Sequence, residues 1–540
     1  MSDMASETDA NERAREPEAS AGFATHSGNH DNASKAAKSG IWYVISNVMI
    51  RAVGIITAPI YTRLLTTSET GYANNFNNYV SIFYVIMGLC LIYSVGRAKL
   101  DFSGESDSDG NSADGRTSGD KGATDGGMSL KEPAFSAKRR FGRSGNEFDA
   151  YMSAIQGLSS IFGAIVLILI VLFSPGGGML GFEKPVVIIL FAYLILFPSI
   201  DYMQYKLRFE YRYKENIAIS VFITVATVVL SIALILLMPN DKGFAKILGT
   251  VIPSAMVALI CYVVLLMRGA ILVDIKYWKY ALMIGLPMIP HGLAMILLAR
   301  IDVSMIQKMC DYSAVGLYTS GYTIGSLLMF ITNAVGSAWV PLFNERLDRG
   351  DIEAIRRDNK VLMEAGCFMT LCFIAVAPEV VKLLYARPYH ESMWVVAPVA
   401  LGTLCQYFYT NYVNTELFYK KTALIAVNSC IAAAVNIGLN YVFILRYGYI
   451  AAAYTTLAGY FILMILHYIT TVHRLKKRIY NDGNYFLMLI LTVAAGTAIG
   501  ALYGGAAVRY TVSLVIISFL AWLWRKDIKS FFRMLKRRQA

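Results

Sequence analysis

Residues 41–71 have the sequence IWYVISNVMIRAVGIITAPIYTRLLTTSETG, and this stretch decides the class of fold. Its first part, Ile41–Tyr61, carries a single charged side chain, Arg51, near the midpoint. A helix needs about 20 apolar residues to cross a hydrocarbon core about 30 Å thick. The stretch therefore predicts a transmembrane helix with a guanidinium group close to its centre.

The charge of Arg51 has two interpretations. A charged side chain at the centre of a membrane helix costs at least about 2.5 kcal/mol and seldom faces lipid. In the first interpretation, Arg51 faces a water-filled cavity and binds an anionic ligand. In the second, the helix lies closer to one membrane surface and Arg51 extends to a lipid headgroup. The sequence leaves both open.

The composition extends this prediction to the whole chain. Of its 540 residues, 56% are hydrophobic and only 16% are charged, whereas soluble domains carry about 25% charged residues. The chain is therefore predicted to cross the membrane many times. The seven cysteines are scattered and form no CxxC pair, so neither a disulfide framework nor a zinc site is predicted.

Fourteen apolar stretches are long enough to cross a membrane, and the loops between them set the orientation. Most of the 49 Lys and Arg residues fall in the two tails and in alternate loops, which the positive-inside rule places in the cytoplasm. Both chain ends are therefore predicted to be cytoplasmic, and the net charge of +12 does not indicate nucleic-acid binding. The predicted spans are 41–62, 76–96, 151–173, 185–203, 217–238, 245–267, 281–299, 316–341, 361–381, 393–412, 422–445, 449–472, 485–504 and 507–524.

Two weak internal matches predict a repeat. SETGYANNFNNYVSIF (68–83) aligns with SAVGLYTSGYTIGSLL (313–328), and YKENIAI (213–219) aligns with YKKTALI (419–425). Each match is six predicted spans apart, so the two halves have the same orientation, as parallel repeats do. The predicted fold is an all-α integral membrane protein with two six-helix lobes in a parallel pseudo-twofold repeat and two further C-terminal helices.

The repeat also predicts the domain organisation. The segment 101–146 has no counterpart in the second half and is rich in Gly, Ser and Asp, so it is predicted to be a disordered cytoplasmic insertion. A regulatory role for it stays open. The predicted units are a disordered tail (1–40), a first lobe (41–270), a second lobe (271–480), two added helices (481–526) and a basic cytoplasmic tail (527–540).

Four arginines belong to the spans that open each half: Arg51, Arg63, Arg97 and Arg300. If the halves enclose a central cavity, these side chains are placed to line it. Arginine forms planar, two-pronged hydrogen bonds with phosphate, so the predicted ligand is a phosphate group. No arrangement of residues predicts a catalytic or a metal site.

Three stretches resemble a known family: PIYTRLLTTSETGYAN (59–74), GLPMIPHGLAMILLARIDVSMIQKMCDYSAVGLYTSGY (285–322) and NIGLNYVFILRYGYIAAAYTTLAGY (436–460). They are similar to the polysaccharide-transporter, or O-antigen-type flippase, branch of the multidrug/oligosaccharidyl-lipid/polysaccharide (MOP) exporter superfamily. The resemblance implies two lobes about a central cavity. The positions that match the family pattern are Pro59, Arg63, Gly71, Pro287, Asp302 and Gly316, of which Asp302 joins the four arginines as a candidate substrate-binding residue.

The resemblance implies a transporter rather than an enzyme. Such proteins move undecaprenyl-diphosphate-linked oligosaccharides across the bacterial cytoplasmic membrane for lipopolysaccharide, capsule or exopolysaccharide synthesis. The implied partners are that lipid-linked substrate, membrane lipids and other polysaccharide assembly proteins. No cofactor is implied, and coupling to Na⁺ or H⁺ stays open. The alternatives are a lipid II-type flippase and a cation-coupled multidrug exporter, although residues 41–65 lack the carboxylate expected of such an exporter.

Overall fold

The computed structural model describes residues 53–102, 147–210 and 212–523. Within these ranges the chain is helical apart from short connections, and no β-strand forms. This confirms the predicted all-α class. The predictions for Arg51, the two tails and most of the insertion concern residues outside these ranges.

The helices have the following bounds. Residues 53–64 are helical and are followed by α2 (Thr67–Met87), α3 (Ile92–Phe102), α4 (Glu147–Phe173), α5 (Lys184–Leu196), α6 (Pro198–Phe209), α7 (Tyr213–Leu237), α8 (Lys242–Gly269), α9 (Ile275–Gly285), the 3₁₀-helix η1 (Leu286–Met288), α10 (Ile289–Met309), α11 (Tyr312–Gly325), α12 (Leu328–Asp348), α13 (Ile352–Leu384), the 3₁₀-helix η2 (Arg387–Ser392), α14 (Met393–Phe418), α15 (Thr422–Tyr447), α16 (Tyr449–Tyr468), the π-helix η3 (Ile469–Arg474), α17 (Asp482–Ala501) and α18 (Ala506–Leu523).

Many of these helices are apolar and long enough to cross a membrane. Among the described residues there are 10 such segments, or 11 when α2 and α3, which are bent by 50°, count as one span. The chain is therefore a multi-pass membrane protein. Helices α14 and α18 are not among these segments, and most of the first predicted span lies outside the described residues. The exact number of fourteen spans stays a prediction.

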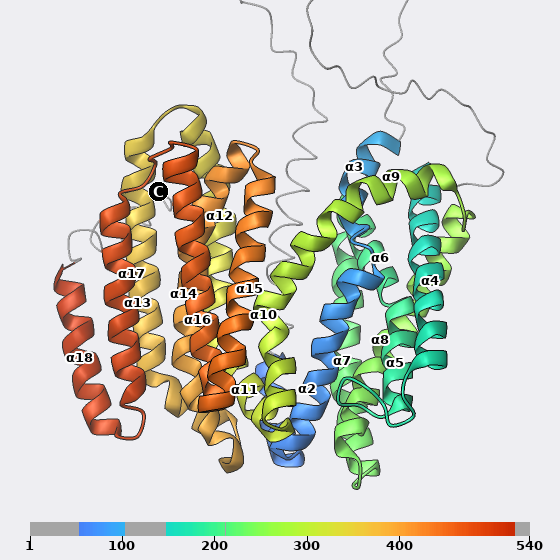
Figure 1. The fold of residues 1–540 in the computed structure, drawn as a ribbon, viewed down its shortest axis with the longest axis horizontal. Helices are drawn as coiled ribbons and strands as arrows, with labels where there is room; N and C mark the ends of the chain where they lie inside the picture. The colour runs from blue at the N-terminus through green and yellow to red at the C-terminus, as the bar shows by residue number, and fades with distance from the viewer. Residues whose placement is uncertain (1–52, 103–146, 211, 524–540) are drawn as a thin grey trace, which may run out of the picture.

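The helices form two groups that meet along α2, α10 and α11 (Figure 1). The first group contains α3–α9 and the second contains α12–α18. Helix α9 packs on α3 and α4, and the indole nitrogen of Trp278 on α9 donates a 2.8 Å hydrogen bond to the Ala154 carbonyl of α4. Helix α10 instead packs on α15 and α2. The chain thus passes from one group to the other at the break around Pro287, and the predicted lobe boundary at residue 270 stays a prediction.

The groups contact each other most closely where α2 crosses α11. A Cβ atom on Gly71 would lie 1.8 Å from the Tyr312 carbonyl oxygen, and one on Gly316 would lie 2.0 Å from the Thr67 carbonyl oxygen. Only glycine permits backbones to approach this closely. The two glycines that the repeat aligned therefore face each other across the junction of the two groups.

Both helices of this junction begin with a side-chain cap at equivalent repeat positions. The Thr66 hydroxyl accepts a hydrogen bond from the Glu69 amide, and the Glu69 carboxylate accepts one from the Thr66 amide at 2.7 Å. In the second half, the Asp311 carboxylate accepts a 2.7 Å hydrogen bond from the Ala314 amide. These caps satisfy amides that helix ends leave unpaired, and they fix where α2 and α11 start.

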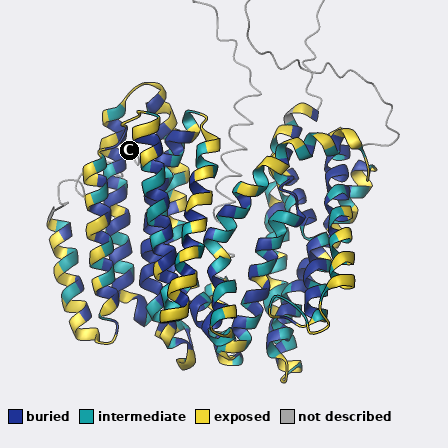
Figure 2. Ribbon diagram, viewed as in Figure 1, coloured by how far each residue is buried: buried dark blue, intermediate teal, exposed yellow. Residues whose placement is uncertain are grey.

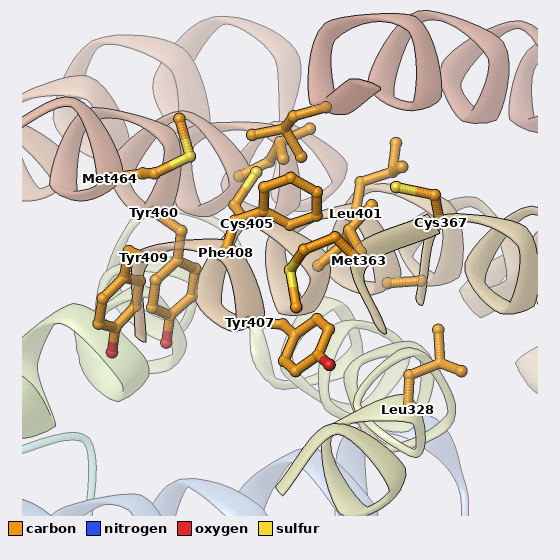
Figure 3. Close-up of a cluster of buried hydrophobic side chains, with 14 of the residues drawn as sticks. Leu328, Met363, Cys367, Leu401, Cys405, Tyr407, Phe408, Tyr409, Tyr460 and Met464 are labelled. Atoms are coloured by element: carbon orange, nitrogen blue, oxygen red, sulfur yellow. The ribbon is translucent and has the colours of Figure 1, made fainter. Parts of the chain in front are cut away.

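The outer faces of the groups are apolar and exposed, whereas their interiors are closely packed (Figure 2). On α7, for example, Phe222, Val225 and Val229 are exposed, as expected of residues that face lipid. Phe408 and Cys405 of α14 lie in the interior of the second group (Figure 3). Several charged side chains inside the groups are paired with an opposite charge, because an isolated buried charge is costly. Two of these pairs are Lys206 with Asp149 and Arg509 with Glu379.

Candidate functional site: a polar cavity between α2, α10 and α11

A cavity of about 210 Å³ lies where the two helix groups meet. Each of the three helices at the junction contributes side chains to it. Among the residues that the structure describes, amides, hydroxyl groups and one guanidinium line it, and no carboxylate does. The lining residues are Asn74, Asn77, Asn78, Ala299, Arg300, Val303, Tyr318, Thr319, Tyr322 and Thr323.

The asparagines come from one face of α2. Asn74, Asn77 and Asn78 are three and four residues apart, which places them on the same side of a helix. Two of them connect the helix groups: the Asn74 amide donates to the Thr319 hydroxyl and the Asn78 amide donates to the Ser304 hydroxyl, both at 2.8 Å. Asn77 is exposed to the cavity. The asparagines therefore fix the junction and also offer polar groups to a ligand.

Arg300 is the charged residue of the lining. It lies on α10, is exposed, and forms no ion pair with any acidic side chain of the described residues. An exposed guanidinium in a cavity whose described lining contains no carboxylate creates a positive potential there. The cavity is therefore suited to an anion, and the surrounding amides and hydroxyls suit a ligand that accepts several hydrogen bonds.

Asp302 lies behind the cavity rather than in it. Its side chain is only 1% exposed. It accepts hydrogen bonds from the Tyr318 hydroxyl, the Thr456 hydroxyl at 3.1 Å and the Val303 amide at 3.0 Å. The carboxylate thus joins α10, α11 and α16 and orients Tyr318, whose ring lines the cavity.

The other predicted site residues are placed differently. Arg63 is exposed near the end of the helix 53–64, and Arg97 on α3 is 69% exposed and forms a 3.1 Å ion pair with Asp101. Neither lines the cavity. Arg51 lies outside the described residues. Of the five predicted residues, the structure brings Arg300 into the cavity and places Asp302 next to it.

Sequence reasoning missed several lining residues. It did not single out Asn74, Asn77, Thr319 or Thr323. Their spacing was a usable signal, because Thr319 and Thr323 are four residues apart and the asparagines share one face of a predicted helix. The signal gains weight from the repeat, which aligns Asn74 with Thr319.

The comparisons with known proteins agree with this fold. One solved structure that matches is titled "Lipid II flippase MurJ, inward closed conformation", with a TM-score of 0.63, 11% identity, and coverage of 90% of this chain and 100% of that one. A multidrug resistance MATE family transporter of the MOP superfamily in an inward-facing conformation matches with a TM-score of 0.53, 12% identity, and coverage of 80% and 98%. A MOP superfamily transporter from Pyrococcus furiosus matches with a TM-score of 0.50, 14% identity, and coverage of 82% and 96%.

The chain has the fold of the MOP superfamily transporters. In addition, residues 146–346 match the family described as "Polysaccharide biosynthesis protein". No curated protein sequence matches the chain significantly. Together, the family match and the fold confirm the predicted resemblance to the polysaccharide-transporter branch of the MOP superfamily. The similar structures are a flippase and transporters, as expected for a transporter rather than an enzyme.

Proposed function

We propose that this MOP-fold protein flips undecaprenyl-diphosphate-linked oligosaccharides across the bacterial cytoplasmic membrane by alternating access. The observation that carries the proposal is Arg300, an exposed guanidinium in a cavity between the two helix groups. No carboxylate is among the described residues that line this cavity. A diphosphate offers several oxygen atoms to such a group, and hydrogen bonds to charged groups are stronger than neutral ones. The match to the polysaccharide biosynthesis family supports an oligosaccharide on that diphosphate.

The cavity lies where alternating access needs a binding site. We place both chain ends in the cytoplasm, so that α2 and α11 begin at the outer face of the membrane. The close Gly71–Gly316 contact then closes the outer side of the junction. Release to the outer leaflet requires α2 and α11 to separate, which breaks the hydrogen bonds of Asn74 and Thr67 across the junction. In this account, the conformation with α2 and α11 in contact precedes release of the substrate.

A lipid II-type flippase is the second candidate, because its substrate carries the same diphosphate on the same lipid. The lipid II flippase has the same fold as this chain at 11% sequence identity. A similarity at this level of identity does not indicate that the two proteins bind the same substrate. The family match favours a polysaccharide precursor. A cation-coupled drug exporter fits less well, because a cationic drug would meet Arg300 without a carboxylate in the cavity lining.

The proposal is tested by measuring the binding of undecaprenyl diphosphate to the purified protein in detergent. Arg300→Ala should weaken binding by about tenfold or more, since a hydrogen bond to a charged group is worth about 1.5–3 kcal/mol. Arg300→Lys should recover part of it, because lysine keeps the charge but lacks the planar fork. Arg97→Ala is the matched control, because Arg97 lies outside the cavity. Equal affinity in wild type and Arg300→Ala would contradict the proposal.

A further inference from the structure

A second polar cavity lies inside the second helix group, between α12 and α14. Its volume is about 300 Å³, at the lower end of the range of about 300–1,000 Å³ typical of small-molecule sites. It has room for a sugar ring but not for a long oligosaccharide. The residues that line it are Thr332, Asn333, Gly336, Ser337, Trp339, Val340, Gln406, Tyr407, Thr410, Asn411 and Asn414.

The lining of this cavity is polar but carries no charge. Four carboxamide side chains, three hydroxyl-bearing side chains from serine and threonine, and two aromatic rings surround it. Carboxamides both donate and accept hydrogen bonds, which matches the hydroxyl groups on the edge of a sugar. Aromatic rings offer flat apolar faces, which match its C–H surface. A charged ligand would find no counter-ion here, so the lining favours a neutral, hydroxyl-rich ligand.

One of the lining residues, Trp339, has a buried polar atom without a partner. Trp339 on α12 is only 6% exposed, and its indole nitrogen has no hydrogen-bond partner in the described residues. Leaving a buried donor unpaired costs about 1–3 kcal/mol. Because neighbouring protein atoms cover this nitrogen, a ligand hydroxyl can accept its hydrogen bond only after the Trp339 side chain shifts toward the cavity.

The opposite side of the cavity is held rigid by α14. Asn411 is 3% exposed; its oxygen accepts a 2.8 Å hydrogen bond from Asn359 and its nitrogen donates a 2.6 Å one to the Tyr485 hydroxyl. One turn before Asn411, the Tyr407 ring points away from the core residue Cys405 (Figure 3). The cavity is therefore built on packed helices, which favours a preformed binding site.

The α12 side of the cavity carries exposed polar side chains at membrane depth. Asn333 and Ser337 are exposed although they lie in the middle of the 312–348 membrane span. Polar side chains at membrane depth usually face the interior of a bundle or a water-filled space. The same span also carries Thr319 and Thr323 of the Arg300 cavity. Both cavities therefore border the same span, formed by α11 and α12.

We infer that the cavity between α12 and α14 binds a sugar ring of the substrate, while the Arg300 cavity binds its diphosphate. This inference rests on the proposed function, because it assumes a lipid-linked saccharide. Under this inference, the Arg300 cavity binds the charged diphosphate that all such lipids share. The neutral cavity between α12 and α14 distinguishes one sugar from another. Trp339, Gln406 and Asn414 are the residues that distinguish one saccharide from another.

The test compares five lipids with the purified protein in detergent: undecaprenyl diphosphate without sugar, and the same lipid carrying glucose, galactose, N-acetylglucosamine or N-acetylgalactosamine. Wild type should bind at least one of the four sugar-bearing lipids about tenfold more tightly than the bare lipid, as two or so neutral hydrogen bonds would give. The double variant Gln406→Ala/Asn414→Ala should lose this difference and keep its affinity for the bare lipid.

Two further variants sharpen the result. Asn344→Ala changes the same residue type on α12 outside the cavity, so it should keep the preference for sugar. In wild type, the sugar-bearing lipid should change tryptophan fluorescence more than the bare lipid does, because Trp339 lines the cavity. Trp339→Phe keeps an aromatic ring but removes the indole, so this difference between the two lipids should disappear. Equal binding of all five lipids by wild type, or a preference that survives in the double variant, would overturn the inference. Failure of wild type to bind even the bare lipid would instead contradict the proposed function on which it rests.

Discussion

The contact between Gly71 and Gly316 leads to a sharp prediction about the transport cycle. In Gly71→Ala, the new methyl group would lie 1.8 Å from the Tyr312 carbonyl oxygen. Because the obstacle is backbone rather than a flexible side chain, α2 and α11 must move apart. We therefore expect this substitution to destabilise the closed junction selectively and to shift the protein toward the state in which the junction is open.

The change in the ratio of closed to open protein can be estimated from the hydrogen bonds that the junction loses. Separation breaks the 2.6 Å hydrogen bond between Thr67 and Ser313 and the 2.8 Å hydrogen bond between Asn74 and Thr319. Neutral hydrogen bonds contribute about 0.5–1.5 kcal/mol each, so the closed junction loses about 1–3 kcal/mol. An energy of this size changes the ratio of closed to open protein by about 5–150-fold.

Disulfide formation between Thr67→Cys and Ser313→Cys measures this ratio. The two native hydroxyl oxygens are 2.6 Å apart, so sulfur atoms in their place can reach the S–S bond length of about 2 Å. The exposed cysteines Cys310 and Cys430 are first changed to serine. Oxidation should cross-link the closed junction efficiently. Because the two cysteines replace the Thr67–Ser313 hydrogen bond, the bond between Asn74 and Thr319 is the one left to lose, and Gly71→Ala should reduce the initial rate of cross-linking by about twofold or more.

Gly438→Ala is the matched control for this experiment. Gly438 also lies within a membrane helix, α15, but a Cβ atom added there meets no other atom within 4 Å. It should therefore leave the cross-linking rate unchanged. An undiminished rate in Gly71→Ala would refute the argument, because it would show that the junction accommodates the methyl group without opening.

Three predictions follow from the sequence. Arg51→Ala should reduce transport strongly at matched membrane levels and Arg51→Lys should restore part of it, whereas an Arg51 that extends to a headgroup would tolerate lysine fully and lose little with alanine. Deletion of residues 103–144 should preserve membrane insertion and transport, because the second half of the repeat lacks this segment; loss of a stably inserted protein would show that the segment is structural. Reporter fusions after Ala386 and after Lys421 should report opposite compartments, because α14 lies between them; the same compartment would mean that α14 does not cross the membrane.

Much of the fold was predictable because a membrane restricts what a chain can form. Apolar stretches of sufficient length must be helices there, so the all-α class followed from the sequence. The repeat was also visible, and the structure gives it a physical meaning because the aligned Gly71 and Gly316 touch. The sequence matched these glycines but did not predict their contact, since an alignment states equivalence and not distance.

The site was less predictable, because charge alone does not say which way a side chain points. Arg63, Arg97 and Arg300 met the same criterion, a cation in a helix that opens one half, yet among them only Arg300 lines the cavity. Arg97 is paired with Asp101 four residues later, which the i, i+4 spacing could have suggested. Asp302 is two residues from Arg300 but faces the interior because successive helix positions point in different directions.

The most direct test of the account is lipid flipping in vesicles that contain the Thr67→Cys/Ser313→Cys protein. The vesicles hold undecaprenyl diphosphate linked to the saccharide that binds most tightly, and an impermeant lectin detects its arrival at the outer surface. The account predicts protein-dependent flipping that stops when the junction is oxidised to a disulfide and returns on reduction. Flipping that continues at full rate with the junction cross-linked, or no flipping by the reduced protein, would contradict it.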